Sequence, residues 1–354
     1  MKKILFYLIS VAMIGYTSCS KEKKEPLLPY GLPGTSIIDM AIDNNHVFYF
    51  VTTEIDKEAL KNWPSYLSYL PYKCYLSRKT KINGNIEILD VSFNAGRKMC
   101  FDKNNHFLTY DANTIYRIDG SLRHAIFELP DKESELSFIA VDNDNNIWAG
   151  SYQTGLYKID NQLDVTHYHV NNSKLPTNNL SDIYIDKNND IWIVTQLTWN
   201  RQGLIKISNE QWIVYDLDLK NPRITSLVTD KNGYLWIGTG WDDEDQSLNC
   251  FNGTSWEIVY PRNEKNEIVE GTVSYLQSDG HKLYVLVAKA KVKDNKIDIS
   301  YTNDLLTFDG KNWEKVYEIP EGDWIGNLIV DDYRQVVWVR TYYDIFKIPF
   351  HLNK

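Results

Sequence analysis

A short sequence pattern that recurs seven times constrains the fold of this chain more than any other feature. Its clearest copy, residues 230–239, reads Asp-Lys-Asn-Gly-Tyr-Leu-Trp-Ile-Gly-Thr. The aspartates that end the apolar runs are Asp43, Asp102, Asp142, Asp186, Asp230, Asp279 and Asp331. Successive aspartates lie 40 to 59 residues apart. A period in this range indicates stacked supersecondary units that bury a shared core.

Each clear copy belongs to a set of four short segments with strand-like alternation. In the fifth copy these segments are residues 224–230, 234–238, 247–251 and 256–260, and Asn252-Gly253 is a hairpin turn. No helical pattern of 10–15 residues lies between them, which argues against a βαβ architecture. We therefore predict an all-β fold, a seven-bladed β-propeller of four-stranded antiparallel blades, with Trp148, Trp192, Trp236 and Trp338 packed between blades.

The seventh copy is incomplete. It supplies segments at 325–330, 336–340 and 345–349, and the sequence then stops at Lys354. An open ring would leave unpaired edges, so we predict that residues 26–33 supply the outer strand of this last blade. Their prolines suit an outermost strand, one edge of which needs no donors. A three-stranded last blade is the alternative.

The N-terminus has the features of a targeting segment. Lys2 and Lys3 precede an apolar stretch, residues 4–15, that is too short to span a bilayer. Residues 16–19, Tyr-Thr-Ser-Cys, resemble the lipobox of bacterial lipoproteins, in which the cysteine is lipidated, although Tyr16 replaces the usual leucine. The resemblance implies a signal peptide over 1–18, a lipid on Cys19 and a tether over 19–25, and the repeats predict a single propeller over 26–354. It places the protein in the bacterial envelope, on the outer membrane, and membrane contact is expected through the lipid only. Ordinary secretion, with Cys19 as a stray thiol, is the alternative.

Charge and residue spacing limit the partners and cofactors. The net charge is −9, and a chain this acidic with only short basic runs is not expected to bind nucleic acid. Cys74, Cys100 and Cys250 show no metal-ligand spacing, and we expect buried thiols at Cys100 and Cys250 without predicting a disulfide. No cofactor is expected. The turn that starts at Asp142 and the acidic run 242–245 have oxygen donors for calcium, but a hairpin turn and a solvated loop explain them better.

Two stretches carry a family resemblance. Residues 178–193 and 224–240 resemble the regulator-propeller repeats of bacterial two-component sensors, and Gly155-Leu-Tyr-Lys-Ile-Asp matches the same family. In that family, paired periplasmic propellers bind ligands such as oligosaccharides and signal to a kinase. This sequence has one propeller and no kinase region, so the resemblance implies a fold and a tendency to bind a ligand.

The candidate site lies where the repeat is interrupted. Inserts between the second and third strands occur at 54–73, 196–202, 241–246, 289–304 and 340–344, and long loops on a rigid scaffold are the usual place for recognition. The proposed ligand-binding residues are Trp63, Tyr66, Trp199, Arg201, Trp241, Asp242, Asp243, Arg340, Tyr342 and Tyr343. Aromatic rings beside charged groups suit a carbohydrate, although these rings can also pack among themselves.

We therefore predict a non-catalytic binding or interaction module whose ligand is a glycan or a protein of the envelope, with no catalytic residues. A propeller hydrolase or lyase, similar to the lyase that opens streptogramin antibiotics, is the alternative. No GxSxG or HExxH motif is present in the sequence to support it.

Overall fold

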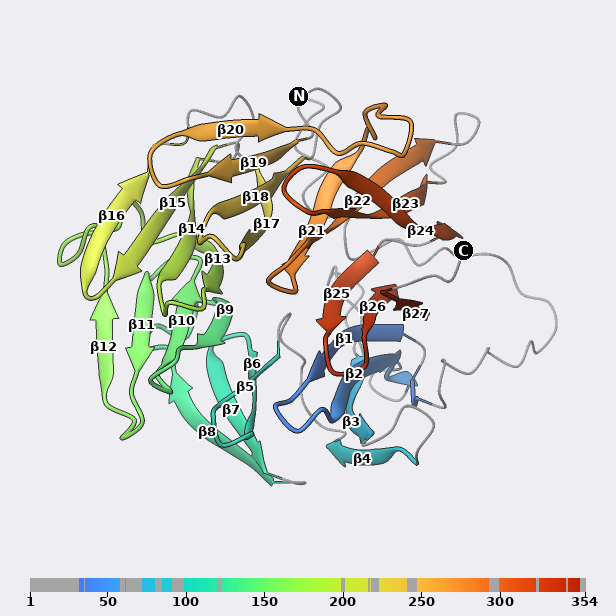
Figure 1. Ribbon diagram of the computed structural model, residues 1–354. Helices are drawn as coiled ribbons and strands as arrows, with labels where there is room; N and C mark the ends of the chain where they lie inside the picture. The colour runs from blue at the N-terminus through green and yellow to red at the C-terminus, as the bar shows by residue number, and fades with distance from the viewer. Residues whose placement is uncertain are drawn as a thin grey trace.

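The chain forms a ring of seven antiparallel sheets, which confirms the predicted β-propeller (Figure 1). The computed structural model describes residues 32–34, 36–57, 61, 72–79, 85–90, 99–119, 122–198, 201–215, 217, 223–240, 247–292, 299–322, 325–341 and 343–350. Six blades have four strands and the seventh has three in this part of the chain. In each blade the strands follow one another in sequence order from the inside of the ring outward.

Blades one to four contain sixteen strands. They are β1 (Ser36–Ile42), β2 (Phe48–Ile55), β3 (Tyr72–Lys79), β4 (Glu87–Asp90), β5 (Cys100–Phe101), β6 (Phe107–Asp111), β7 (Thr114–Asp119), β8 (Leu122–Glu128), β9 (Leu136–Val141), β10 (Ile147–Ser151), β11 (Leu156–Ile159), β12 (Val165–Tyr168), β13 (Leu180–Ile185), β14 (Ile191–Thr198), β15 (Arg201–Ser208) and β16 (Gln211–Tyr215).

Blades five to seven contain the remaining strands. They are β17 (Ile224–Thr229), β18 (Leu235–Thr239), β19 (Leu248–Phe251), β20 (Trp256–Val259), β21 (Thr272–Ser278), β22 (Leu283–Val292), β23 (Ile299–Phe308), β24 (Trp313–Gly322), β25 (Ile325–Asp331), β26 (Val336–Thr341) and β27 (Ile345–Pro349).

The core is divided among the junctions between blades. Seven clusters of buried apolar side chains each join two successive blades, and the seventh blade joins the first in the same way. The four repeat tryptophans lie in four of these clusters and are at most 6% exposed, so their predicted packing role is confirmed. A four-stranded sheet has two apolar faces that only neighbouring blades can cover, which explains this distribution.

The repeat aspartate holds the turn between the first two strands of its blade. Asp142 Oδ1 accepts the backbone N–H groups of Asp144 (2.9 Å) and Asn146 (2.8 Å), and its Oδ2 accepts the indole N–H of Trp148 (2.8 Å). Asp186 and Asp230 repeat this arrangement with their own turns and tryptophans. The protein's own donors therefore occupy these carboxylates, which confirms the interpretation of the segment as a hairpin turn.

Neighbouring turns are also bonded to one another. The fourth residue of the turn has a positive φ, and in three blades it is an asparagine: Asn105 (62°), Asn145 (65°) and Asn189 (65°). Each asparagine accepts, through its side-chain oxygen, a backbone N–H from the turn of the preceding blade, at 3.2, 2.8 and 2.7 Å respectively. Asparagine suits this position because it tolerates the left-handed conformation and supplies the acceptor. These bonds join the turns of blades one to four along one face of the ring.

The predicted closing strand falls mostly outside the described residues. Residues 26–31 are not described, whereas Leu32 and Pro33 are, and neither of these two belongs to a strand. Leu32 is 2% exposed and packs with residues of blades one and seven. The closure of blade seven by the N-terminal segment therefore stays a prediction.

Candidate functional site

Two of the three described candidate residues are exposed at the predicted face. Arg201 lies at the start of β15, and the side chain of Tyr343 is 48% exposed in the turn before β27. Arg340 is instead 4% exposed inside the junction between blades seven and one. Trp63, Tyr66, Trp199, Trp241, Asp242, Asp243 and Tyr342 lie outside the described residues, as does Cys19.

Four of the five predicted inserts are partly strand rather than loop: residues 340–341 end β26, and in blades one, four and six the strands run further. Residues 289–292 continue β22 and residues 299–304 belong to β23, with Lys289 paired to Thr302 and Val292 to Ile299. In blade four, Gln196 pairs with Gln202 and Thr198 with Arg201. In blade one, Ile55 pairs with Tyr72. These three blades therefore extend their second and third strands beyond those of blades three, five and seven.

A buried hydroxyl marks the position where the regular blades turn back. Ser151, Thr239 and Thr341 pair with the innermost-strand residue that lies just before its β-bulge, and they bond to the turn that follows. Thr52 and Thr195 occupy the same position in blades one and four, where the strand runs on. Their buried hydroxyls have no hydrogen-bond partner among the described residues. Blades one and four therefore keep the repeat residue but lose the turn that it caps elsewhere.

Arg340 belongs to a buried polar cluster that joins blades seven, one and two. Asp39 accepts hydrogen bonds from the Asn327 side chain (2.8 Å) and from the backbone N–H of Met99 (3.2 Å). Arg340 Nη1 donates to the carbonyl of Ile37 at 2.7 Å, and its charge acts on Asp39. Burial raises the pKa of Asp39, while the Arg340 charge works in the opposite direction. In this structure Arg340 serves the junction between blades.

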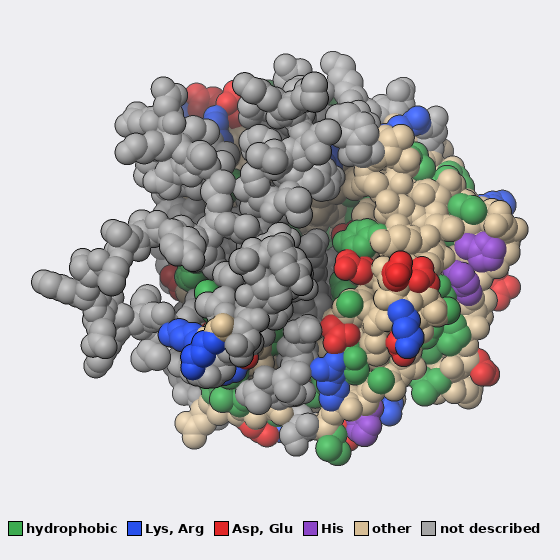
Figure 2. Space-filling model, turned by 180° about the vertical axis from the view of Figure 1, so that it is seen from behind, with side chains coloured by type: hydrophobic (Ala, Val, Ile, Leu, Met, Phe, Trp, Pro, Cys, Tyr) green, Lys and Arg blue, Asp and Glu red, His purple; other side chains and the backbone are tan. Residues whose placement is uncertain are grey.

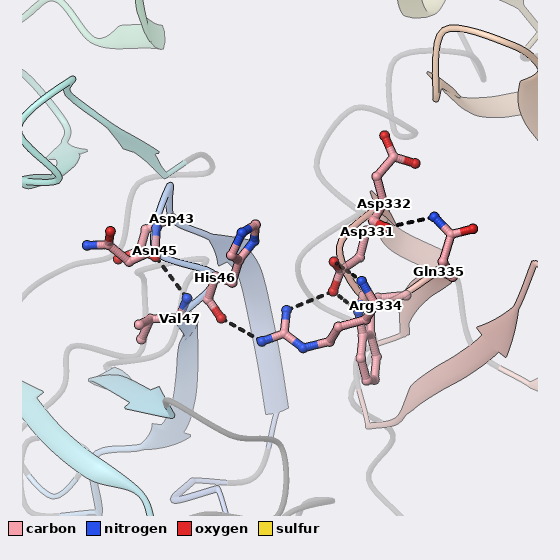
Figure 3. Close-up of polar contacts among 9 residues, drawn as sticks. Asp43, Asn45, His46, Val47, Asp331, Asp332, Arg334 and Gln335 are labelled. Atoms are coloured by element: carbon pink, nitrogen blue, oxygen red, sulfur yellow. Dashed lines mark hydrogen bonds and ion pairs between the residues drawn. The ribbon is translucent and has the colours of Figure 1, made fainter.

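A contact between the first and seventh turns closes the opposite face (Figure 3). Arg334 donates to the carboxylate of Asp331 at 2.9 Å and to the carbonyl of His46 at 2.6 Å. The ring of His46 stacks on Tyr333 with centroids 3.9 Å apart, and the Arg334 guanidinium lies over Phe48. The Arg334 guanidinium, as a donor, thus links the seventh turn to the first, whereas an asparagine oxygen, as an acceptor, links the earlier turns.

A pocket lies beside this closure, between the turns of blades six and seven. Five residues separate the paired strand ends in blades one to five, for example 230–234, and four do so in blade six, 279–282, whereas in blade seven the repeat aspartate Asp331 itself pairs with Val336. A cavity of about 330 Å³ opens between these two turns. Asp279, His281, Lys282, Tyr284, Asp332, Gln335 and Phe350 line it. Its volume is at the lower end of the range for small-ligand sites.

The two carboxylates of this pocket, Asp279 and Asp332, have different surroundings. Asp279 accepts two backbone N–H groups and the hydroxyl of Tyr284, at 2.6, 2.7 and 3.0 Å. The pKa of Asp332 is raised by burial first and then by the nearby carboxylates of Asp279 and Asp331. Sequence reasoning missed this pocket, although the single-residue shortening of the turn after Asp279 was its visible signal.

The described residues contain neither a metal-ligand cluster nor a membrane-spanning helix. Within the described ranges, no three His, Cys, Asp or Glu side chains are placed to hold a metal ion. Cys74 and Cys250 are buried, Cys100 is partly exposed, and burial raises the pKa of both the Cys100 and the Cys250 thiol to about 12. No described helix has the length and apolar character needed to cross a membrane.

Seen from behind, the described surface intersperses acidic, basic and apolar side chains (Figure 2).

The comparison with protein families confirms the repeat resemblance. Residues 218–241 match the family described as "Two component regulator propeller". This segment contains the copy of the repeat that begins at Asp230. Among curated proteins, none matches the sequence.

Solved structures share the fold at low sequence identity. PorZ from Porphyromonas gingivalis, described as an essential bacterial surface component of the type-IX secretion system, is 15% identical with a TM-score of 0.57; the match covers 88% of this chain and 46% of PorZ. The Pan2 WD40 domain of Neurospora crassa is 10% identical with a TM-score of 0.59, over 88% and 89% of the two chains. The GH74 enzyme of Niastella koreensis is 11% identical with a TM-score of 0.54, over 91% and 66%. The chain thus spans about half of PorZ, and these likenesses show the propeller fold alone.

Proposed function

We propose that this chain is a non-catalytic binding module outside the cytoplasm, held to the outer membrane by a lipid on Cys19, with a glycan or an envelope protein as its ligand. The regulator-propeller repeat supports a ligand-binding role by analogy. The lipobox-like sequence before Cys19 supports the anchor. PorZ, a surface component by its description, shows that a propeller can serve in a bacterial envelope.

The observation that carries the binding role is the shared position of the extended strands. All strand 2–3 connections lie at one end of the antiparallel blades. The strands β2, β14 and β22 are 8, 8 and 10 residues long and run further toward this end than β10 and β18, which are 5 residues long. The inserts beyond β2 and β14 contain Trp63, Tyr66 and Trp199. Variation gathered at one end of a regular scaffold is typical of a recognition face.

The chemistry of this face suits a carbohydrate better than a charged polymer. Aromatic rings offer flat apolar surface to a sugar ring while a polar edge keeps contact with water. Arg201, exposed at the base of the blade-four insert, supplies several N–H donors in one plane for hydroxyl groups. Tyr343, exposed in blade seven, supplies a ring with a hydroxyl.

A glycan array probed with residues 20–354 tests the proposal. We expect binding to a defined set of glycans, and a loss of at least about tenfold in affinity for Trp199→Ala and Trp241→Ala, equivalent to about 1.4 kcal/mol. Tyr234→Ala is the matched control, because this exposed tyrosine lies on the opposite turn face. Its affinity should equal that of the unmodified protein.

The outcomes separate the alternatives. An array without any binding rules out the glycan, and co-purification from envelope extracts that depends on Trp199 and Trp241 then identifies a protein ligand. Release of shortened products from a bound glycan would instead establish the enzymatic alternative. Failure of both arms would contradict the binding module.

A further inference from the structure

The strand 1–2 turns are bonded to one another around most of the ring, but not on either side of blade six. Asparagines link the turns of blades one to four, Lys187 donates to the carbonyl of Lys231 in the turn of blade five (2.8 Å), and Arg334 links blade seven to blade one. Among the described residues, no hydrogen bond joins the turn of blade six, residues 279–282, to the turn of blade five or blade seven. The cavity of about 330 Å³ lies at the second of these unbridged junctions.

The turn of blade seven folds its side chains back instead of bridging to blade six. Gln335 has a positive φ of 55°, the conformation that the bridging asparagines have in earlier blades. Its side-chain N–H, however, donates to the carbonyl of Asp332 in the same turn (2.7 Å). Figure 3 shows the side chains of Asp332 and Gln335 on the side of this turn away from His46. The Asp332 carboxylate and the Gln335 side-chain oxygen are therefore available to the cavity.

Asp332 brings an unneutralised carboxylate to the cavity. Its oxygens make no hydrogen bond or ion pair with a described residue, whereas the neighbouring Asp331 accepts Arg334 at 2.9 Å. Burial raises the pKa of Asp332 first, the carboxylates of Asp279 and Asp331 raise it further, and His281 acts in the opposite direction. The surroundings therefore disfavour the charge on Asp332, and a cation beside it would stabilise that charge.

Lys282 lines the cavity but does not neutralise its carboxylates. Its Nζ lies 3.8 Å from the carboxylate of Glu314 on β24, the outer strand of the same blade. Within the described part of the chain it forms no ion pair with Asp279 or Asp332. While His281 is neutral, the lining therefore carries more negative than positive charge.

Two aromatic rings form the apolar part of the lining. The ring centroids of Tyr284 and Phe350 lie 5.4 Å apart, and the Tyr284 hydroxyl donates to Asp279 at 3.0 Å. Aromatic rings attract organic cations through their electron-rich faces. A metal ion would instead need several ligands around it, and no three His, Cys, Asp or Glu side chains of the described residues are placed to supply them. Carboxylates beside aromatic rings therefore favour an organic cation over a metal ion.

We propose that this cavity binds an organic cation, a guanidinium or ammonium group, with Asp332 as its counter-ion and the rings of Tyr284 and Phe350 as its apolar wall. Asp279 and the Gln335 side-chain oxygen supply further acceptors from the turns of blades six and seven. The volume suits one basic side chain or a small amine. The site lies on the turn face, at the opposite end of the blades from the strand 2–3 connections, so it does not depend on the proposed function.

Ligand-observed NMR titrations of the full-length protein test the site. Nα-acetyl-arginine methylamide and Nα-acetyl-lysine methylamide supply the two cations, and Nα-acetyl-citrulline methylamide is the neutral isostere of the first. We expect saturable binding of a cationic probe and at least about tenfold weaker binding of the citrulline probe, because the charge contributes most of the recognition.

Two substitutions in the cavity and one outside it locate the binding. Asp332→Asn should weaken binding of the cationic probe at least about tenfold, and the exposed position of Asp332 should leave the fold intact. Phe350→Leu keeps an apolar side chain but removes the ring, and we expect severalfold weaker binding. Asp144→Asn is the matched control, because it removes one carboxylate from the exposed turn of blade three and should leave the affinity unchanged.

Agmatine and putrescine distinguish the source of the cation, because they carry the same head groups without a peptide backbone. Tighter binding of the blocked amino acids indicates a basic side chain of a protein, and tighter binding of the free amines indicates a small metabolite. Equal affinity for the arginine and citrulline probes overturns the proposal. Unchanged affinity in Asp332→Asn or Phe350→Leu also overturns it, as does the absence of saturable binding by every cationic probe.

Discussion

The two aspartate-centred turns of blade three allow a matched test of the repeat module. Asp142 is 4% exposed and accepts two backbone N–H groups, the Asn146 amide and the Trp148 indole. Asp160 lies in the outer hairpin of the same blade and accepts two backbone N–H groups at 2.9 Å, but no indole. The comparison therefore isolates the buried half of the interaction.

The magnitudes follow from the donors that each substitution leaves without an acceptor. Asp142→Ala leaves an indole N–H and turn amides unsatisfied beside a buried core, and we expect a loss of about 3–5 kcal/mol in the free energy of unfolding. Asp160→Ala leaves its amides close to water, and we expect about 1 kcal/mol. Trp148→Phe removes the indole donor but keeps the turn bonds, so its effect should lie between these two values.

Urea unfolding followed by circular dichroism and by tryptophan fluorescence provides the measurement. Coincident transitions with equal slopes permit the free energies to be compared. An Asp160→Ala variant as destabilised as Asp142→Ala would refute the reasoning, because the indole and the burial would then contribute nothing.

Three further predictions concern the turns, a close contact and pH. Asn189→Ala should lower the free energy of unfolding by about 1–3 kcal/mol, because it removes the bond to Asn143 N–H and places alanine at a φ of 65°. Asn189→Gly should lower it less, because glycine accepts that φ, as Gly233 does in blade five. Thermal unfolding of both variants ranks them. Gly150→Ala should destabilise by about 1–3 kcal/mol, because the new Cβ would lie 2.2 Å from the Phe138 ring, and the double variant Gly150→Ala/Phe138→Leu should recover part of the loss in a urea titration. Burial raises the folded-state pKa of Asp39, so the folded state binds this proton more tightly than the unfolded state. Asp39 therefore favours folding at low pH, and its contribution to stability falls as the pH rises from the unfolded pKa of about 3.8 through the raised folded pKa. Asp39→Asn should remove this pH dependence, and parallel stability–pH curves for the two proteins would contradict it.

The strands of the clear repeats could be predicted because local signals agreed there. In the fifth copy, the segments predicted from alternation and turn residues end within one residue of β17–β20. The extended hairpin of blade six was harder to predict, since Lys289, Lys291 and Asp304 suggested a charged loop. Pairing between β22 and β23 outweighs the low strand propensity of these residues.

The burial of Arg340 could not be predicted from local pattern. Its position, two residues after the repeat tryptophan, is occupied by glycine in blades three and five, and the interruption of the repeat placed Arg340 at the start of the predicted insert 340–344. The structure accommodates the guanidinium because Gly326 in the facing strand has no side chain: a Cβ there would lie 1.8 Å from Arg340 Nη2. Such complementarity depends on which strand lies opposite, and the sequence alone does not contain that information.

The contacts between the first and last blades have a consequence for how the ring forms. Those made by Asn327, Arg334 and Arg340 join residues 288 to 303 positions apart. Interactions of such large sequence separation form late, after the entropy of closing the long loop has been overcome. A chain that emerges amino end first from a ribosome or a secretion pore has no residue 340 to offer Ile37 until that residue is through. Before that point blades one to six form an open stack, in which the outward sheet faces of blade one and blade six are exposed. This interval before ring closure is when the protein is most vulnerable to aggregation and proteolysis.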